Sequence, residues 1–290
     1  MTRTLRVLVL TLVMIILPWI AMGREPISIL LLGTDEQRDL TGGEDQVSRA
    51  DAIFLLTIHP EQGGFRLLSI ERDYLVELPG DLGPNKLGTS TYFGGPDLAI
   101  DMVNQLFQTN VAHYIQIDIQ GIIKAVDYVG GITVEVYEDE VDEVNYFIDG
   151  IMTYKGLRHV TAGMNRLNGP EAWAFMGVRN QEIDSVLSNA GRNDRQRRVV
   201  AAGMEQLSGM DFHDAFALST ELLPLIKTNI SLSYLFEIIQ QGLTNDVKNI
   251  KQMYTPQGEY QIRTVRMHRV VIVSDMEQEV QGVHSFLFEE

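Results

Sequence analysis

Four charged residues bracket one short stretch of the chain, and their types suit the binding of phosphate and a metal ion. Arg49 and Asp51 precede the first of two apolar runs, and Arg72 and Asp73 follow the second. Guanidinium groups bind phosphate oxygens in pairs, and carboxylate oxygens are the ligands that Mg²⁺ prefers. The alternative is two ordinary surface ion pairs, and these four residues by themselves favour that alternative.

A β-hairpin would bring the four residues together. Residues 52–58 and 65–70 are β-rich, and the turn residues of 59–64 separate them. Such a pattern predicts an antiparallel hairpin. The start of its first strand and the end of its second lie at the same end, so the charged residues share one rim of the sheet.

A third strand adds another carboxylate to this rim. Residues 27–33 form a short apolar run that ends in Thr34 and Asp35. If this strand pairs antiparallel with residues 52–58, Asp35 lies beside Asp51. Two neighbouring carboxylates with access to water suit Mg²⁺, with Mn²⁺ as an alternative.

A basic face is predicted much later in the chain. Residues 191–207 predict a helix that begins at Gly191. Arg192, Arg195, Gln196 and Val199 are three or four positions apart and share one face. Arg192 would lie in the first turn, where free N–H groups and the helix dipole favour an anion. A solvated basic face is the alternative.

The order of elements predicts an α/β protein. A strand over 113–119, a helix over 120–129 and a strand over 132–137 indicate a parallel pair with a right-handed crossover. Together with the antiparallel strands they predict a mixed central β-sheet flanked by helices, a three-layer α-β-α arrangement. Further helices are expected from Pro96, from Pro170, over 212–226 and after Asp275, and a further strand over 269–273. The acidic run 138–143 is expected to be a solvated face.

The first 24 residues predict a membrane segment. Arg3 and Arg6 precede an apolar run over residues 7–23, which at about 17 residues is near the short limit of a spanning helix. A cleaved signal peptide is the alternative, with residues 21–23 as the cleavage site. Both place residues 25–290, predicted to be a single domain, outside the cytoplasm.

Composition excludes several functions. The net charge of −16 argues against nucleic acid as a partner, because phosphate backbones need a basic surface. An anionic substrate therefore needs a local group of arginines. The chain has no cysteine, which excludes disulfides and thiol catalysis.

A set of motifs in fixed order resembles the LytR-CpsA-Psr (LCP) family, and the likeness runs from about Ile27 to the end of the chain. The motifs are Leu31-Leu32-Gly33-Thr34-Asp35, Arg49-Ala50-Asp51, Ser69-Ile70-Glu71-Arg72-Asp73, Asn85-Lys86-Leu87, Tyr92-Phe93-Gly94-Gly95-Pro96, Val129-Gly130-Gly131-Ile132-Thr133-Val134 and Gly191-Arg192-Asn193-Asp194-Arg195-Gln196. No single motif is decisive, but the set is far more specific than any member.

The resemblance implies a membrane-anchored transferase outside the cell. It would move a glycopolymer, such as a teichoic acid, from a polyprenyl-pyrophosphate carrier to peptidoglycan, with Mg²⁺ as cofactor. By motif, Asp35 and Asp51 would hold the metal, and Asp51, Arg72 and Asp73 would be catalytic, with Asp51 or Asp73 as the base. The pyrophosphate would be bound by Arg49, Arg72, Lys86, Arg179, Arg192 and Gln196, and a tunnel for the prenyl chain would be lined by residues such as Phe93, Ile122 and Val126.

Three positions depart from the family pattern. Glu71 stands where the family has proline, Gln181 where it has a second arginine, and Asn189 where it has an aspartate. Two other functions therefore stay open. One is a membrane-tethered polyprenyl-phosphate-binding or regulatory protein with weakened catalysis. The other is a pyrophosphatase that acts on the same lipids.

Overall fold

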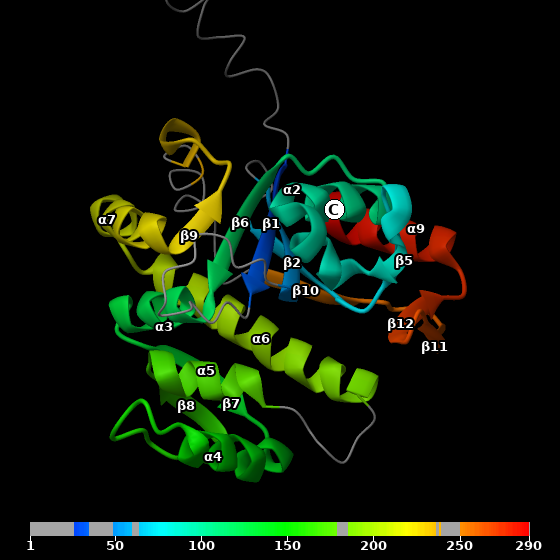
Figure 1. The fold of residues 1–290 in the computed structure, drawn as a ribbon. Helices are drawn as coiled ribbons and strands as arrows, with labels where there is room; N and C mark the ends of the chain where they lie inside the picture. Colours follow the sequence, from blue (N-terminus) through cyan, green and yellow to red (C-terminus); the bar gives the residue numbers. More distant parts are fainter. Residues whose placement is uncertain are drawn as a thin grey trace, which may run out of the picture.

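A six-stranded sheet forms the centre of the molecule (Figure 1). The computed structural model describes residues 26–34, 49–59, 64–178, 185–235, 238 and 250–289. The strands of the sheet lie in the order β10-β3-β2-β1-β6-β9. Their bounds are β1 Ile27–Thr34, β2 Ala50–Ile58, β3 Phe65–Ile70, β6 His113–Asp118, β9 Ile226–Thr228 and β10 Ile250–Thr255.

The sheet is mixed, as predicted. β1, β2 and β3 form the expected antiparallel meander, in which Gly33 pairs with Ala52 and Phe54 with Ser69. Two parallel pairs extend it, β1 with β6 and β3 with β10. The strand β10 begins 180 positions after β3 ends, and the sequence pattern gave no sign of it.

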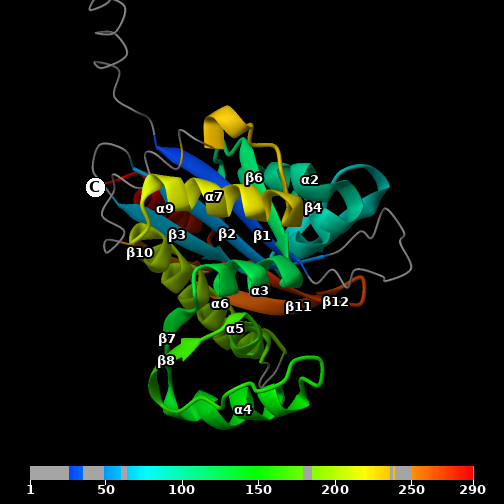
Figure 2. The same ribbon diagram turned by 90° about the vertical axis from the view of Figure 1, so that its left-hand side faces the viewer.

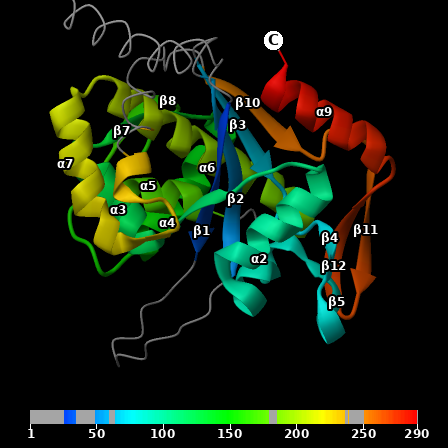
Figure 3. The ribbon, with the colours of Figure 1, turned by 90° about the horizontal axis from the view of Figure 1, so that it is seen from above.

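Helices cover both faces of this sheet (Figure 3). α2 (Ser90–Phe107) and α9 (Met276–Phe288) lie on one face, and α3 (Ile119–Tyr128), α6 (Ser185–Ser208) and α7 (Phe212–Leu222) lie on the other. The predicted α/β class, a mixed central sheet flanked by helices, is confirmed.

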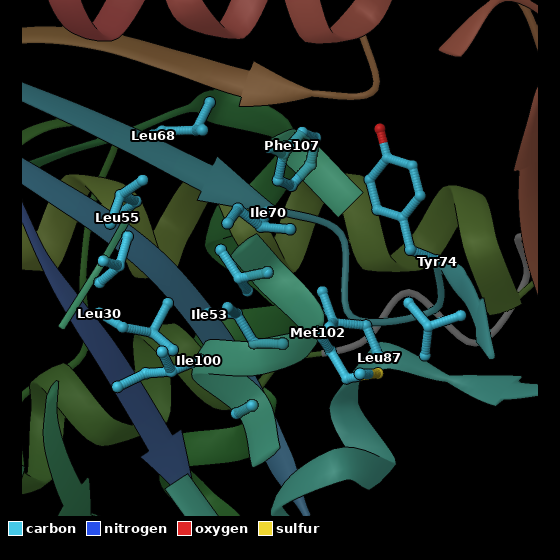
Figure 4. Packing of buried hydrophobic residues seen from close by; sticks show 14 of the residues in the cluster. Leu30, Ile53, Leu55, Leu68, Ile70, Tyr74, Leu87, Ile100, Met102 and Phe107 are labelled. Carbon is cyan, nitrogen blue, oxygen red and sulfur yellow. The ribbon is translucent and has the colours of Figure 1, made fainter. Parts of the chain in front are cut away.

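The main core fills the space between the sheet and the α2/α9 layer (Figure 4). Because side chains alternate along a strand, every second residue points into this core. Leu30, Ile53, Leu55 and Leu68 lie there, and each is at most 2% exposed. The residues between them, such as Leu31, face the opposite helices.

A smaller unit packs beside α6 and α3 (Figure 2). It consists of β7 (Ile132–Val136), α4 (Val141–Gly150), β8 (Gly163–Leu167) and α5 (Gly169–Gly177), with its own buried cluster. β7 pairs antiparallel with β8, so the predicted parallel pair of residues 113–119 and 132–137 is wrong. The reason is that both edges of β6 are already occupied, by β1 and β9.

Two predicted helix boundaries are also corrected. The helix expected over 212–226 ends at Leu222; a 3₁₀ turn that contains Pro224 follows and leads into β9. Proline lacks the N–H that would continue the helix. The helix expected from Pro96 begins earlier, at Ser90, and Gly94 and Gly95 kink it just before that proline.

Short elements complete the chain. A hairpin of β4 (Leu75–Leu78) and β5 (Gly83–Lys86) follows the meander, and a hairpin of β11 (Tyr260–Val265) and β12 (His268–Val273) precedes α9. The 3₁₀ turns are η1 Gly80–Leu82, η2 Leu87–Thr89, η3 Glu138–Glu140 and η4 Leu223–Leu225. Asn168 and Asp275 both accept a backbone N–H at their helix starts.

The predicted membrane segment, residues 1–24, lies outside the described residues. A search of the described helices finds none with both the length and the apolar character needed to cross a bilayer.

Candidate functional site

The hairpin brings two of the predicted catalytic residues into contact. Asp51 lies at the start of β2, and Arg72 follows the end of β3, so both stand at one edge of the sheet. The Arg72 Nη1 atom forms an ion pair with the Asp51 carboxylate. Their side chains are 20% and 25% exposed, so the pair is partly buried and yet open to a ligand. The shared rim predicted from the sequence is confirmed for these residues.

Asp73 lies beside two positively charged side chains at the same edge. Its side chain is 5% exposed, and its Oδ1 atom lies 3.0 Å from the Lys86 Nζ and 3.6 Å from the Arg72 Nε. The β4/β5 hairpin delivers Lys86, which pairs with Leu75. Asp73 therefore orients Arg72 and Lys86 rather than lining the pocket described below.

α6 supplies a second guanidinium. The Arg192 side chain is 4% exposed; its Nη2 donates to the Asp51 carbonyl oxygen at 3.4 Å and lies 3.8 Å from the Asp51 Oδ1. Arg72 and Arg192 therefore converge on Asp51 from opposite parts of the chain. The expectation that Arg192 lies in the first helical turn is wrong, because α6 begins at Ser185. Its guanidinium, and not free backbone N–H groups, would contact an anion.

An apolar pocket of about 440 Å³ leads away from this group of charges, between the sheet, α3, α5 and α6. Asp51, Arg192 and Gln196 line its polar end. Its apolar walls include Leu31, Phe54, Ile115, Ile117, Ile122, Phe147, Trp173, Met176, Val199 and Val200. This size falls within the usual range for small-molecule sites, about 300–1,000 Å³.

Two buried polar atoms are found among the residues that line this pocket. The Thr34 Oγ1 and the Gln196 Oε1 have no hydrogen-bond partner among the described residues. A buried polar atom without a partner costs free energy, and such atoms in a pocket usually meet a ligand or water. The pocket therefore suits a molecule with a polar head and an apolar tail.

The remaining predicted site residues differ in whether they line the pocket. Arg49 lies over the Tyr92 ring, 5.9 Å from its centroid, and is exposed. Of the three residues named for the tunnel, Ile122 lines the pocket, Phe93 is 42% exposed, and Val126 packs in the core of the smaller unit. Asp35 and Arg179 lie outside the described residues.

Arg195, expected on the same face as Arg192, serves another contact. Its Nη1 lies 3.1 Å from the Glu140 Oε1, and its Nη2 donates to the Val178 carbonyl oxygen at 2.7 Å. Arg198 also pairs with Glu140. The acidic run 138–143 is thus not uniformly solvated as expected: Glu140 is buried because two arginines of α6 neutralise it.

Burial and hydrogen bonding act on the pKa of Glu140 in opposite directions. Burial opposes ionisation, but hydrogen bonds from Arg198, the Tyr137 N–H and Arg195 outweigh it and hold the pKa below its ordinary value. The carboxylate is therefore charged at neutral pH, and it anchors α6 to the smaller unit.

Sequence reasoning missed a buried group directly behind the site. Glu71 is fully buried and accepts hydrogen bonds from Asn193 and Tyr254. Its place where the family has proline was the available signal, and its side-chain partners Asn193 and Tyr254 lie more than 120 positions away. The aromatic wall formed by Phe147 and Trp173 was missed too.

The described residues contain no group of three or more His, Cys, Asp or Glu side chains that would hold a metal ion. Asp51 is the only predicted metal ligand among them. Its carboxylate is a hard oxygen donor at the polar end of the pocket, which fits one ligand of a Mg²⁺ site.

The fold and the pocket together define a class: an α/β protein whose sheet and helices enclose an apolar pocket with arginines at its polar end. Within this class, the chain belongs to the LytR_cpsA_psr family, whose model matches residues 18–280. The family predicted from the motifs is thus confirmed, and the relatives bear the names of enzymes, as expected.

Two curated relatives illustrate the likeness. Both are named polyisoprenyl-teichoic acid–peptidoglycan teichoic acid transferase TagU. The protein from Oceanobacillus iheyensis is 29% identical over 268 residues, which cover 90% of this chain and 75% of the relative. The one from Halalkalibacterium halodurans is 28% identical over 262 residues, which cover 90% of this chain and 78% of the relative.

Solved structures share the fold. B. subtilis TagV superposes with a TM-score of 0.70 at 23% identity, covering 92% of this chain and 98% of TagV. A LytR-CPS2A-psr family protein, YwtF (TagT), with bound octaprenyl pyrophosphate lipid superposes with a TM-score of 0.66 at 20% identity, covering 91% of each chain.

Proposed function

We propose that this protein is an extracytoplasmic phosphotransferase that moves a glycopolymer from a polyprenyl-pyrophosphate carrier onto peptidoglycan. The observation that carries the proposal is the apolar pocket whose polar end is formed by Asp51, Arg192 and Gln196, with Arg72 paired to Asp51. Relatives named as teichoic acid transferases, and a related fold solved with octaprenyl pyrophosphate, support it.

The pocket offers different surroundings to the two parts of the carrier lipid. The prenyl chain would lie against apolar walls such as Ile117 and Val200, which gain from leaving water. The pyrophosphate would lie at the polar end, bound by Arg72 and Arg192, and the amide N–H groups of Gln196 would donate to it. Arg49, Lys86 and Arg179 are proposed as further ligands of the pyrophosphate or of the phosphate that leaves.

The step forms one P–O bond and breaks another. An acceptor hydroxyl of peptidoglycan attacks the phosphorus that carries the polymer, the bond to the second phosphate breaks, and polyprenyl phosphate leaves. Phosphoryl transfer depends mainly on positioning and on neutralising charge, which two converging guanidinium groups supply. Asp51 lines the pocket, so it is placed better than Asp73 to take the proton of the hydroxyl.

We further propose that Asp51 and Asp35 hold Mg²⁺, with Mn²⁺ as a substitute. When bound, the metal would neutralise part of the charge of the two phosphates. Asp51 would then share its oxygens between the metal and Arg72, which explains why a carboxylate and a guanidinium stand together at the mouth of the pocket.

The proposed location is the outer face of the cell membrane, with residues 1–24 as a single-pass anchor. The carrier lipid and peptidoglycan would both be within reach there. If the segment is cleaved, the protein is secreted. The location can be tested with carboxyl-terminal fusions to a reporter that is active only outside the cytoplasm. The fusions are compared with and without residues 1–24.

The decisive experiment is a transfer assay with Arg72→Ala. The full-length protein is incubated with a polyprenyl-pyrophosphate-linked glycopolymer, peptidoglycan and Mg²⁺, and the bound polymer is quantified. We expect Arg72→Ala to abolish transfer while the circular dichroism spectrum and melting temperature stay near those of the wild type. Arg263→Ala is the matched control, because that arginine lies on β11 and its exposed guanidinium donates to Gln261 of the same strand.

Product analysis separates the alternative functions. Polymer joined to peptidoglycan through a phosphodiester supports the transferase. Free phosphorylated polymer from the wild type would show a pyrophosphatase instead. Lipid binding without any product would show a binding or regulatory protein, and unchanged turnover of Arg72→Ala would contradict the proposed site.

A further inference from the structure

The buried carboxyl group of Glu71 receives three hydrogen bonds. The Asp73 backbone N–H donates to its Oε1 at 3.1 Å, the Asn193 Nδ2 donates to its Oε2 at 3.1 Å, and the Tyr254 hydroxyl donates to its Oε2 at 2.7 Å. Glu71 itself is 0% exposed. A carboxylate accepts hydrogen bonds without donating, so it matches three donors as no neutral side chain can.

These donors tie together three separate parts of the chain. Asp73 belongs to the turn after β3, Asn193 to α6 and Tyr254 to β10. Glu71 is the neighbour of Arg72 in sequence, and Asn193 is the neighbour of Arg192. One carboxyl group therefore joins the backbone segments that carry the two guanidinium groups at the pocket.

We propose that Glu71 is a positioning residue, which sets the spacing of Arg72 and Arg192 so that both contact one pyrophosphate. This inference rests on the proposed function, because it takes the pyrophosphate head group as the ligand. Glu71 is not among the residues that line the pocket, so in this proposal it acts through its neighbours.

The charge of Glu71 also affects the two arginines. Arg72 and Arg192 repel each other as they converge on one site, and Asp51 and Asp73 neutralise them only in part. A further negative charge behind them reduces this repulsion. The described groups that face Glu71 include Tyr254, Tyr74, Asp73, Arg192 and Asn193.

Burial raises the pKa of Glu71, and Asp73 adds to this, while the Tyr254 hydrogen bond, the Asp73 N–H and Arg192 oppose it. The folded protein therefore binds this proton more tightly than the unfolded chain. The protonated group contributes stability below the ordinary pKa of glutamate, and that contribution is lost as the pH rises through the raised pKa. Ionising Glu71 in the folded protein thus costs stability.

This cost separates positioning from a purely structural role. If Glu71 served the fold alone, Glu71→Gln would lower stability by breaking its hydrogen bonds. If it positions the arginines, Glu71→Gln removes a buried charge, keeps or raises the melting temperature, and still weakens ligand binding. Loss of affinity without loss of stability is the signature of the proposed role.

The experiment measures binding of geranylgeranyl pyrophosphate with Mg²⁺ to the full-length protein at several pH values, together with the melting temperature. We expect Glu71→Gln to weaken binding about tenfold at neutral pH, because small misplacements of binding groups cost up to ~10²-fold. Wild-type affinity should fall as the pH drops through the raised pKa, and the variant should lose this dependence. Tyr254→Phe, which removes one donor, should give a smaller loss.

Glu279→Gln is the matched control. Glu279 is also a buried carboxyl, and it accepts from the Thr255 hydroxyl and the N–H groups of Gln257 and Gly258. It lies on α9, on the opposite face of the sheet from α6. Its replacement should leave the affinity for the probe unchanged.

Three outcomes would overturn the inference. One is Glu71→Gln binding the probe as the wild type does at every pH. Another is an equal loss of affinity in Glu71→Gln and Glu279→Gln that follows a loss of stability. The third is a wild-type protein that fails to bind the probe at all; this outcome alone also overturns the proposed function.

Discussion

At the scale of single residues, Asp51 connects the two arginines of the candidate site. It forms an ion pair with Arg72, and its backbone and side-chain oxygens both face Arg192. Asp51 therefore contacts both guanidinium groups that would bind a pyrophosphate in our proposal. A metal ion that shares the Asp51 oxygens would weaken these contacts, which couples metal binding to phosphate binding.

The first prediction concerns this coupling. Chelation of Mg²⁺ should stop transfer, and added Mg²⁺ should restore it. Asp51→Asn keeps the size of the side chain and removes the charge, so it should raise the Mg²⁺ concentration for half-maximal activity at least tenfold, since even outer partners of a metal typically cost ~10–100-fold. A Mg²⁺ titration of the transfer rate measures this effect.

Asp81→Asn is the control, because Asp81 is an exposed residue of the η1 turn. It should behave as the wild type does. An Asp51→Asn protein with unchanged Mg²⁺ dependence would remove Asp51 from the metal site. Its ion pair with Arg72 and its proposed role as the base would remain.

At the scale of elements, α6 joins the pocket to the smaller unit. Arg192, Gln196 and Val199 line the pocket, while Arg195 and Arg198 bind Glu140. The Arg198 guanidinium also lies over the Tyr137 and Phe175 rings, at 4.3 Å and 4.9 Å from their centroids. The cluster around Glu140 therefore fixes the rotation of α6, and with it the direction in which Arg192 points.

The second prediction follows from that cluster. Glu140→Gln removes the carboxylate shared by the buried Arg195 and the partly buried Arg198, which keeps its ion pair with Asp194. Breaking a buried ion pair typically costs about 3–5 kcal/mol. The free energy of unfolding from urea titrations at neutral pH measures the loss. The exposed neighbour Glu138 provides the control, and Glu138→Gln should change stability little.

This effect has a defined pH dependence. Since the folded protein holds the pKa of Glu140 below its ordinary value, the pair stabilises the fold above that value. The contribution is lost as the pH falls through the lowered pKa. The difference between the wild type and Glu140→Gln should therefore shrink in acid. A difference that stays constant down to acid pH would contradict the role given to Glu140.

At the scale of the whole molecule, the two faces of the central sheet have different roles. The face towards α2 and α9 packs into a continuous core, whereas the face towards α3 and α6 leaves the pocket open. Neighbouring residues of one strand take the two roles: Leu30 lies in the core, and Leu31 lines the pocket. The rigid layer on one side thus supports a cavity on the other.

The third prediction tests the pocket as the place of the prenyl chain. Ile122→Trp on α3 adds volume to the pocket wall and should weaken binding of geranylgeranyl pyrophosphate about tenfold, with little effect on inorganic pyrophosphate. Lys124→Trp, on the same helix and exposed, should change neither affinity. Isothermal titration calorimetry with both ligands measures the difference.

Equal losses for the long-chain and the inorganic ligand would show that Ile122→Trp disturbs the polar end as well. Unchanged binding of the long-chain ligand would place the lipid tail elsewhere. In either case the apolar pocket would lose its assigned role.

The sequence by itself determined the parts of this protein that depend on short-range physics. The meander followed from two β-rich runs around a turn, and it brought Asp51 to Arg72 because antiparallel strands share their ends. The helix expected from Pro170 is present as α5, because proline is favoured in the first turn of a helix and Asn168 caps it. The motifs, taken in order, identified the family.

Tertiary structure alone decided which neighbour each element meets. β7 pairs with β8 because the edges of β6 were taken, and β10 joins β3 across most of the chain. On α6, helical periodicity grouped Arg192 with Arg195, yet the packing of the smaller unit turned Arg195 to Glu140. Periodicity states which side chains share a face, but the boundary between two contacting layers depends on segments far away in the sequence. The pocket, the burial of Glu71 and its ties to Asn193 and Tyr254 have the same origin.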